Sequence, residues 1–265
     1  MIPFVKAHAC GNDFLILEEA VAGRAHAALA RKLCARNTSI GADGIEFLER
    51  RAKGEFFLRL FNADGSEAEL SGNGTRCVAA WLAQSEGLRE VALGTHSGVR
   101  MCRVISGEGS QYLIESEMGV PRVMPQTIVV DGVGNVEGAM VNVGNPHFVL
   151  FVESHTFSAH GLAWQELGAK ISLSPLFPHG TNVEFVKILA ANEIAFRIYE
   201  RGCGPTTSSG TGTCASSAAA IALRGAAREL TAIAEGGAQR TVWPAPDAAM
   251  LLTGPAEIVC RGEVF

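Results

Sequence analysis

Short apolar runs separated by glycine-rich turns make up most of this chain, and they predict strands rather than long helices. Between residues 55 and 62 the side chains alternate, with Phe57, Arg59 and Phe61 set against Phe56, Leu58 and Leu60. The strands predicted in this way are Pro3–His8, Phe14–Glu18, Gly44–Leu48, Glu55–Asn62, several between Val91 and Met118, one before Asn142, Phe148–Glu153, Val183–Lys187, Ala195–Tyr199 and Ala256–Val264, with a hairpin involving Val242 and Ala249–Leu252.

Helical spacing occurs in fewer places. Ala20–Arg36 has apolar residues at helical intervals and predicts one amphipathic helix, and a second helix is expected around Gly161–Gly168. Two alanine-rich segments, Thr75–Gln84 and Thr213–Arg224, each follow a polar, glycine-rich turn.

The turn before the second alanine-rich segment reads Ser209-Gly210-Thr211-Gly212. Its glycines allow the backbone to come close to a ligand. The free N–H groups and the positive dipole end of the helix would face this turn and suit a carboxylate or a phosphate. The alternative is that the turn does no more than cap the helix.

The same pattern occurs twice. Ser71-Gly72-Asn73-Gly74 precedes the first alanine-rich segment and matches Ser209–Gly212 at an offset of 209 − 71 = 138 residues. Other matches are Asn62 with Glu200, Gly44–Phe47 with Asn182–Phe185 and, at 133 residues, Gly11-Asn12 with Gly144-Asn145. These repeats predict two pseudo-symmetric halves, residues 1–118 and 119–255. We expect their two helix starts, and hence Ser71 and Ser209, to face each other around one ligand.

Composition and charge limit the class of protein. The 265 residues are 48% hydrophobic and 18% charged, which suits two globular domains. A formal net charge of −5 without a basic cluster argues against nucleic acid as a partner. No apolar run approaches the ~20 residues of a membrane span, and no signal peptide is apparent, so a cytoplasmic protein is expected. Seven scattered cysteines indicate neither a disulfide framework nor a metal site.

Five motifs together carry a resemblance to a known family. They are Gly11-Asn12-Asp13-Phe14, Asn62-Ala-Asp-Gly-Ser-Glu, Gly72-Asn73-Gly74-x-Arg76-Cys77, Gly144-Asn145-Pro146-His147 and Glu200-Arg201-Gly202-x-Gly204. The sequence resembles diaminopimelate epimerase over almost its whole length. The resemblance implies an α+β fold of two like domains, each a mixed or antiparallel sheet wrapped around a central helix, with the final strand (about 256–265) returning to the first. It also implies epimerisation of LL- to meso-diaminopimelate without metal or pyridoxal cofactor, in lysine and peptidoglycan precursor synthesis.

Inverting a stereocentre without a cofactor needs one group that removes the α-proton and another that delivers a proton to the opposite face. The resemblance places these catalytic groups at Ser71 and Ser209, where the family has cysteines. A serine hydroxyl is a poor base unless a neighbouring group activates it. Three accounts stay open: cysteines replaced to stop turnover, a natural variant whose serines work slowly, and a relative that binds without catalysing. Pro205 and Thr207-Ser208 also depart from the family pattern, which favours a natural variant.

By resemblance, the residues that bind the substrate are Asn12, Asn62, Gly72, Asn73, Asn145, Asn182, Glu200, Arg201, Gly210 and Thr211. Arg201 is expected to hold the distal carboxylate of a diamino diacid, because its guanidinium can bind a carboxylate with two hydrogen bonds. Gly44 stands where some members have glutamine, so one polar contact is absent. Cys10, Cys203 and His147 are candidates for an assisting base, with structural roles as the alternative. A homodimer is one candidate assembly, and the only other partner expected is a small amino acid. A non-catalytic amino-acid-binding protein on the same scaffold is the second functional hypothesis.

Overall fold

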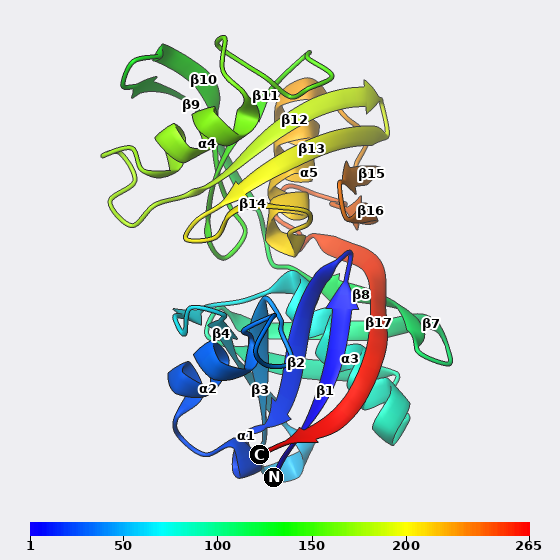
Figure 1. Cartoon of the computed structure of the whole chain (residues 1–265). Coiled ribbons are helices and arrows are strands. Elements are labelled where there is room, and N and C mark those ends of the chain that lie inside the picture. Colours follow the sequence, from blue (N-terminus) through cyan, green and yellow to red (C-terminus); the bar gives the residue numbers. More distant parts are fainter. The chain divides into compact units, whose positions relative to one another are not determined.

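Strands dominate the computed structural model of the chain, as the short apolar runs predict, and they belong to two compact units (Figure 1). The first unit comprises Met1–Glu117 and Thr253–Phe265, and the second comprises Met118–Leu252. The structure describes residues 1–265, apart from the side chain of Lys53. The fold is α+β.

The strands of the first unit pair in a closed ring. β1 (Ile2–Ala9) pairs with β2 (Asn12–Glu18) on one side and with β17 (Leu251–Val264) on the other. From β2 the ring continues through β3 (Gly44–Arg50), β4 (Phe56–Asn62), β6 (Glu90–Thr95), β7 (Gly98–Glu108) and β8 (Gln111–Glu117), which pairs with β17. The short β5 (Glu67–Ala68) adds to β4. The result is a barrel in which the β2–β3 and β4–β6 pairs are parallel.

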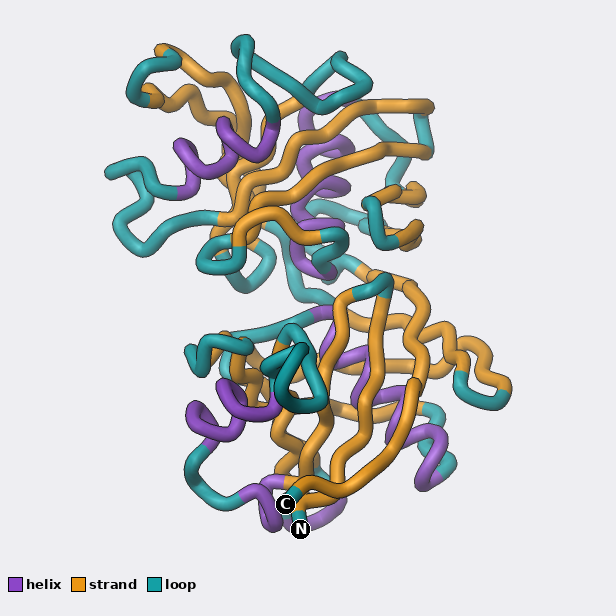
Figure 2. The backbone as a smooth tube through the Cα atoms, in the orientation of Figure 1, coloured by secondary structure: helices purple, strands orange, loops and turns teal.

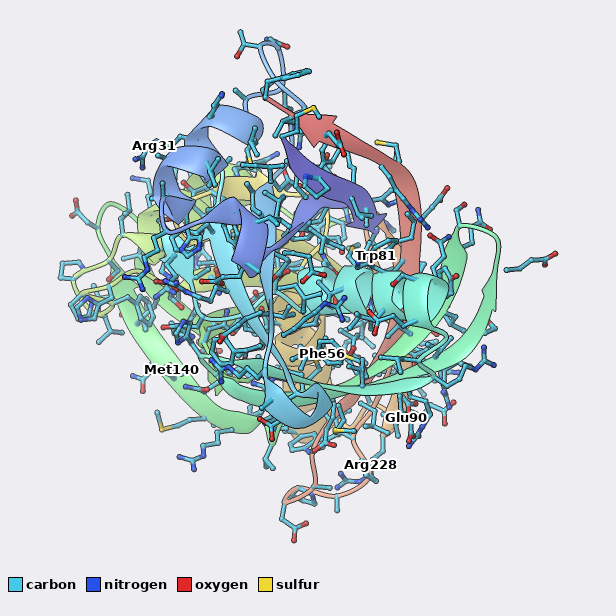
Figure 3. All side chains as sticks on the ribbon, turned by 90° about the horizontal axis from the view of Figure 1, so that it is seen from below. Arg31, Phe56, Trp81, Glu90, Met140 and Arg228 are labelled. Atoms are coloured by element: carbon cyan, nitrogen blue, oxygen red, sulfur yellow. The ribbon has the colours of Figure 1, made fainter. Side chains whose placement is uncertain are left out.

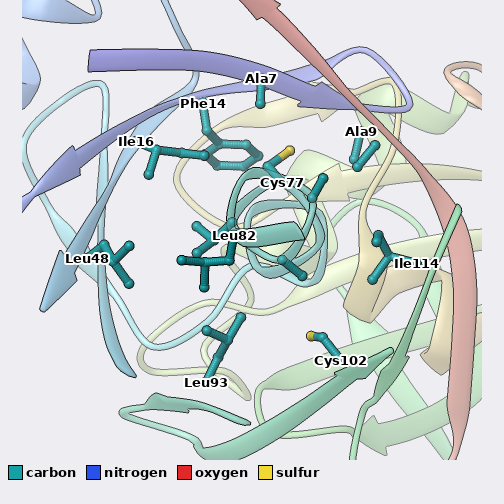
Figure 4. Close-up of a cluster of buried hydrophobic side chains, with 14 of the residues drawn as sticks. Ala7, Ala9, Phe14, Ile16, Leu48, Cys77, Leu82, Leu93, Cys102 and Ile114 are labelled. Carbon is teal, nitrogen blue, oxygen red and sulfur yellow. The ribbon is translucent and has the colours of Figure 1, made fainter. Parts of the chain in front are cut away.

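Helix α3 (Gly72–Glu86) fills this barrel and contacts β1, β2, β3, β6, β7 and β8. Figure 4 shows Cys77 and Leu82 of the helix among apolar side chains of the surrounding strands, such as Phe14 and Leu93. Outside the barrel, α1 (Glu19–Ala22), α2 (His26–Leu33) and the 3-10 turn η1 (Ala52–Gly54) complete the unit. Near the end of α3, Trp81 (Figure 3) packs under the Arg261 guanidinium, whose Cζ lies 4.5 Å from the ring centroid.

The second unit repeats this plan around α5 (Gly210–Arg224), as the purple helices among orange strands in Figure 2 show. Its strands pair in the order β9 (Arg122–Val130), β10 (Gly134–Asn142), β11 (Pro146–Phe151), β12 (Asn182–Ala190), β13 (Glu193–Glu200), β15 (Glu229–Ala234) and β16 (Gly237–Val242), and all seven contact α5. The short β14 (Gly204–Thr206) pairs with β13, and α4 (Trp164–Ser172) packs against β12 and β13.

Strand order and register are the same in the two units. In each unit, an antiparallel pair of strands is followed by a parallel pair. The parallel pair is β2–β3 in the first unit, where Phe14 lies opposite Gly44. It is β11–β12 in the second unit, where His147 lies opposite Asn182. Parallel pairs β4–β6 and β13–β15 also correspond. The sequence repeat at 138 residues is therefore a repeat of structure.

Several predicted boundaries were wrong. Ala20–Arg36 is two helices rather than one, because Gly23 adopts φ 70° and ends α1. The alanine-rich helices begin earlier than Thr75 and Thr213, because Ser71 and Ser209 cap them and the following glycines are already helical. Of the residues expected to form a hairpin, Val242 ends β16, and Leu251 and Leu252 begin β17.

Candidate functional site

Both alanine-rich helices begin at a serine that caps them. Ser71 precedes α3 in an extended conformation, and its Oγ accepts a hydrogen bond from the N–H of Gly74 at 3.0 Å. Ser209 precedes α5 in the same way, and its Oγ accepts from Gly212 at 3.2 Å. Serine is a favoured residue at this position because its oxygen satisfies one of the free N–H groups of the first turn. The predicted catalytic pair thus occupies equivalent places, each next to the positive end of a helix.

A buried arginine organises the start of α3. Arg76 is fully buried, and its guanidinium donates to Asn73 Oδ1 at 2.6 Å and to the Gly72 carbonyl at 3.1 Å. Asn73 in turn donates to Asn12 Oδ1 at 3.1 Å. The structure therefore joins three predicted substrate-binding residues of the first unit. The positive charge of Arg76 adds to that of the helix end, which favours an anionic ligand there.

A charged cluster holds the loop that carries Asn12. Asn12 donates to Asp43 at 2.6 Å, and Arg36 bridges Asp43 and Asp13 with 2.7 Å contacts to both. Burial raises the pKa of Asp13, but hydrogen bonds from Arg36 and Lys6 outweigh it and leave that pKa below its usual value. Asp13 is therefore ionised near neutrality, and the loop is fixed by charge-assisted hydrogen bonds.

The start of α5 shows a matching contact. Asn145 donates to Thr211 Oγ1 at 3.3 Å, which repeats the Asn12–Asn73 contact with residues at the equivalent positions. The side-chain oxygen of Asn145, Oδ1, also lies 2.8 Å from His147 Nε2. Thr211 follows Gly210 in the first turn of the helix, and its hydroxyl is 3.4 Å from that of Ser209. His147 therefore helps to orient the amide of Asn145.

Glu200 lies beside Ser209. Burial raises the pKa of Glu200, while a hydrogen bond from Thr206, at 2.5 Å, and the nearby Ser209 hydroxyl oppose this rise. The Ser209 hydroxyl thus accepts from the Gly212 N–H and lies close enough to Glu200 to affect the ionisation of its carboxyl group. A carboxylate that accepts the hydroxyl proton is the kind of neighbour that makes a serine a usable base. Glu200 was expected to bind substrate, and its position near Ser209 suits it to a second role.

Two further predicted residues of the second unit contact each other. Asn182 accepts a hydrogen bond from the backbone N–H of Arg201 at 2.9 Å and donates to the Pro146 carbonyl at 3.1 Å. The Arg201 side chain lies close to Gly180. A β-carbon added to Gly180 would lie 3.0 Å from Arg201 Cγ. In the first unit, Asn62 donates to Ser66 in the turn after β4 and is not joined to the Asn12–Asn73 contact by any described hydrogen bond.

Two buried glutamates were not among the predicted site residues. Glu184 on β12 is fully buried, and its Oε1 lies 2.6 Å from His147 Nδ1. Burial raises the pKa of Glu184, although His147 opposes this. Glu46 on β3 holds the equivalent place in the first unit, and burial raises its pKa to about 8. The sequence repeat pointed to these two residues, because the matched segments Gly44–Phe47 and Asn182–Phe185 each have a glutamate at the third position.

The two candidate cysteines lie in the turns that follow β1 and β13. Cys10 is buried in the β1–β2 turn with φ 52°, and it borders a hollow of about 550 Å³ that His8, Tyr112 and Glu257 also line. Cys203 is exposed in the turn after β13. Among the described residues, no group of three or more His, Cys, Asp or Glu side chains is arranged to hold a metal ion. No described helix is long and apolar enough to cross a membrane.

Comparison with known sequences gives a consistent result. The family described as diaminopimelate epimerase matches residues 4–124 and 139–259. A diaminopimelate epimerase from Halothermothrix orenii is 36% identical over 283 residues, which cover 99% of this chain and 98% of that protein. One from Pelotomaculum thermopropionicum is 35% identical over 278 residues, covering 98% of each.

Comparison with solved structures identifies other proteins that share this fold. A predicted epimerase from Pseudomonas aeruginosa aligns with a TM-score of 0.74 at 16% identity, covering 100% of this chain and 99% of that one. A probable proline racemase from Agrobacterium radiobacter, with bound carbonate, aligns with a TM-score of 0.73 at 18% identity, covering 100% and 93%. At these identities the alignments show a shared fold.

Proposed function

The chain belongs to the diaminopimelate epimerase family, and from that premise we propose that it interconverts LL- and meso-diaminopimelate by proton transfer at the α-carbon, with Ser71 and Ser209 as the two groups that exchange the proton. Each helix start carries a hydroxyl group, that of Ser71 or Ser209, beside the free N–H groups of the first turn. The substrate α-carboxylate would take the N–H groups at Gly72-Asn73 and Gly210-Thr211, where positive helix ends stabilise the negative charge that develops at the α-carbon.

The position of Glu200 near Ser209 carries this proposal, because a neighbouring carboxylate supplies the base that a serine lacks. In one direction Ser209 takes the α-proton while its own hydroxyl proton passes to the Glu200 carboxylate. In the other direction the protons move back, so Glu200 is the store of the proton and Ser209 is the group that touches substrate. Asn12, Asn62, Asn145, Asn182 and Arg201 would hold the amino group and the distal end of the substrate.

One observation favours a second candidate function, an amino-acid-binding protein without turnover. Both serine hydroxyls already serve as helix caps, accepting hydrogen bonds from Gly74 and Gly212. A capping role alone would explain why serine is found at these two positions.

The experiment that separates the two functions follows the α-proton. The protein is incubated with LL- or meso-diaminopimelate in D₂O, and deuterium at the α-carbon is measured together with the isomer composition. Incorporation with inversion supports the epimerase. Calorimetric binding of diaminopimelate without any deuterium incorporation supports the binding protein, and absence of binding rules out this substrate.

Arg201→Lys tests the proposed recognition of the distal carboxylate. The substitution keeps the charge but removes the planar pair of donors, so binding of diaminopimelate is expected to weaken by roughly tenfold or more. Binding of a monocarboxylic amino acid of similar length, measured by the same calorimetry, is the control and is expected to change little. An equal loss for both ligands would mean that Arg201 does not contact the distal carboxylate.

A further inference from the structure

Side chains at the start of α3 form a chain of hydrogen bonds whose direction is fixed. The Arg76 guanidinium donates to Asn73 Oδ1 at 2.6 Å. Because a guanidinium has no acceptor, this contact settles which end of the Asn73 amide is the oxygen. The NH2 group of Asn73 therefore faces Asn12 Oδ1, to which it donates at 3.1 Å. The amide of Asn12 is fixed in the same way, and its own NH2 group donates to Asp43 Oδ2 at 2.6 Å.

Asp43 ends this chain. A carboxylate only accepts hydrogen bonds, so Asp43 sets the direction of the Asn12 amide in the same sense as Arg76 does from the other end. Asn12 is thus held both at its side-chain nitrogen and at its side-chain oxygen. A planar amide held at two atoms has its second N–H in a single direction. No described hydrogen bond uses this second N–H of Asn12, which leaves it for a ligand.

The Asp43 carboxylate is itself held in place. Its Oδ1 accepts from Arg36 at 2.7 Å, and its Oδ2 accepts from the backbone N–H of Asp13 at 3.1 Å as well as from Asn12. The backbone N–H of Asp43 donates in return to Asp13 Oδ1 at 3.1 Å. Hydrogen bonds between charged groups are among the stronger ones in proteins. The side chain of Asp43 therefore cannot turn away from Asn12 without breaking other contacts, although it is 42% exposed.

The second unit orients its asparagine differently. Thr181 stands at the position that matches Asp43 (43 + 138 = 181), so the sequence repeat does not extend to this carboxylate. Asn145 turns its NH2 group to the start of its helix, where it donates to Thr211. Asn12 instead turns its oxygen to the start of α3. The two asparagines thus present opposite ends of their amides to the two helix starts.

We propose that Asp43 is a positioning residue for substrate binding, because through Asn12 it fixes the direction in which that amide offers its second N–H to the ligand. The inference rests on the proposed function, in which Asn12 binds diaminopimelate. The acceptors of diaminopimelate are its carboxylate oxygens, since both amino groups are protonated near neutrality. With the amide of Asn12 reversed, its donor and its acceptor would exchange places, and the contact with a carboxylate oxygen would be lost.

The test compares Asp43→Ala with Asp43→Asn by calorimetric titration with diaminopimelate, in which the stoichiometry reports the folded fraction. Alanine offers no acceptor to the Asn12 NH2 group, so the affinity is expected to fall by about tenfold. Asparagine can still turn an oxygen to Asn12, because the exposed Arg36 is able to move away from its NH2 group. We therefore expect Asp43→Asn to keep most of the affinity, with a loss of no more than about threefold.

A role of charge alone predicts the opposite result. Removing a carboxylate near an anion-binding site should tighten the binding of a carboxylate ligand, and by the same amount in both variants. Glu18→Gln is the matched control. Glu18 lies at the other end of β2 and is also paired with an arginine, Arg50, so its substitution should leave the affinity unchanged.

NMR of the side-chain amides gives a readout that needs no ligand. One Nδ2 proton of Asn12 faces a carboxylate oxygen, so the two protons of this NH2 group should resonate far apart in the unmodified protein. The separation should persist in Asp43→Asn and decrease in Asp43→Ala. Asn12→Asp identifies the two signals by removing them.

Equal losses of affinity in the two Asp43 variants, unchanged affinity in Asp43→Ala, or tighter binding in either would overturn the positioning role. So would Asn12 amide signals that do not respond to Asp43→Ala. Should Asp43→Ala not fold, Arg36→Gln is the deciding variant, since it releases the Asp43 carboxylate without removing it. A smaller loss of affinity is then expected, and no loss would contradict the proposal. If the unmodified protein does not bind diaminopimelate, the proposed substrate fails, while the NMR comparison still decides whether Asp43 orients Asn12.

Discussion

Replacing Ser71 and Ser209 together by cysteine is expected to raise the rate of diaminopimelate epimerisation by roughly 10²- to 10⁴-fold, the usual contribution of a positioned acid–base group. Both side chains lie at the N-cap of a helix. A thiol in that place has a lowered pKa, so a useful fraction is thiolate near neutrality, whereas a serine hydroxyl depends on a neighbouring carboxyl group. The rate of inversion and the α-deuterium content are measured for all four serine and cysteine combinations.

The single substitutions serve as the controls. Each group is the acid in one direction and the base in the other, so single replacements should recover much less than the double, and the effects should not multiply. The thiol is also the poorer helix cap, and we expect each replacement to lower stability by about 1 kcal/mol. A serine protein that already matches the double variant in rate would show that serine is not limiting here.

Gly74→Ala is expected to destabilise the protein markedly, by about 2 kcal/mol or more, although alanine is normally the better helix residue by about 1 kcal/mol. The added methyl group would overlap the carboxyl of Glu46, which is buried in the closed barrel and has little room to move. Chemical denaturation monitored by circular dichroism gives the free energy of unfolding.

Two further variants identify the cause. Glu46→Ala in the Gly74→Ala background should restore most of the lost stability, because it removes the overlapping group, and this non-additivity is the mark of direct contact. Gly212→Ala is the counterpart in the second unit. Its β-carbon would lie 2.6 Å from Ile198 Cδ1, the flexible end of a side chain, and 3.1 Å from Glu184 Oε1, so a smaller loss is expected. Additive effects of Gly74→Ala and Glu46→Ala would contradict the proposed clash.

Local sequence patterns predicted the strands well, because alternation and glycine-rich turns are properties of a few adjacent residues. Gly44–Leu48 and Val183–Lys187 fall within β3 and β12. The helix starts were misplaced because glycine is a poor helix former in isolation, and the capping hydrogen bonds of Ser71 and Ser209 are what make Gly72 and Gly210 helical. The single helix expected over Ala20–Arg36 failed for a similar reason, since one glycine with positive φ outweighs the propensity of its neighbours.

The site was predictable where it depends on short motifs, and less so where it depends on burial. Ser71, Ser209 and the two asparagines Asn12 and Asn145 lie in loops that the sequence marks clearly. Glu46 and Glu184 lie in otherwise apolar strands, and nothing in their own neighbourhood tells whether such a carboxyl faces water or the inside of a barrel. That requires the strand register. The position of Glu200 near Ser209 likewise depends on how β13 packs beside α5.

The return of β17 to the first barrel affects the order in which the protein can fold during synthesis. Ile2 pairs with Val264, so the barrel that contains the first residues of the chain cannot close until the last ones have left the ribosome. The second unit, Met118–Leu252, is complete in sequence before that point. The half synthesised later is therefore able to fold first, while the earlier half waits with an open sheet edge at β1 and β8. Such an edge can pair with other chains, and a nascent chain of this family has reason to need protection there until its final strand arrives.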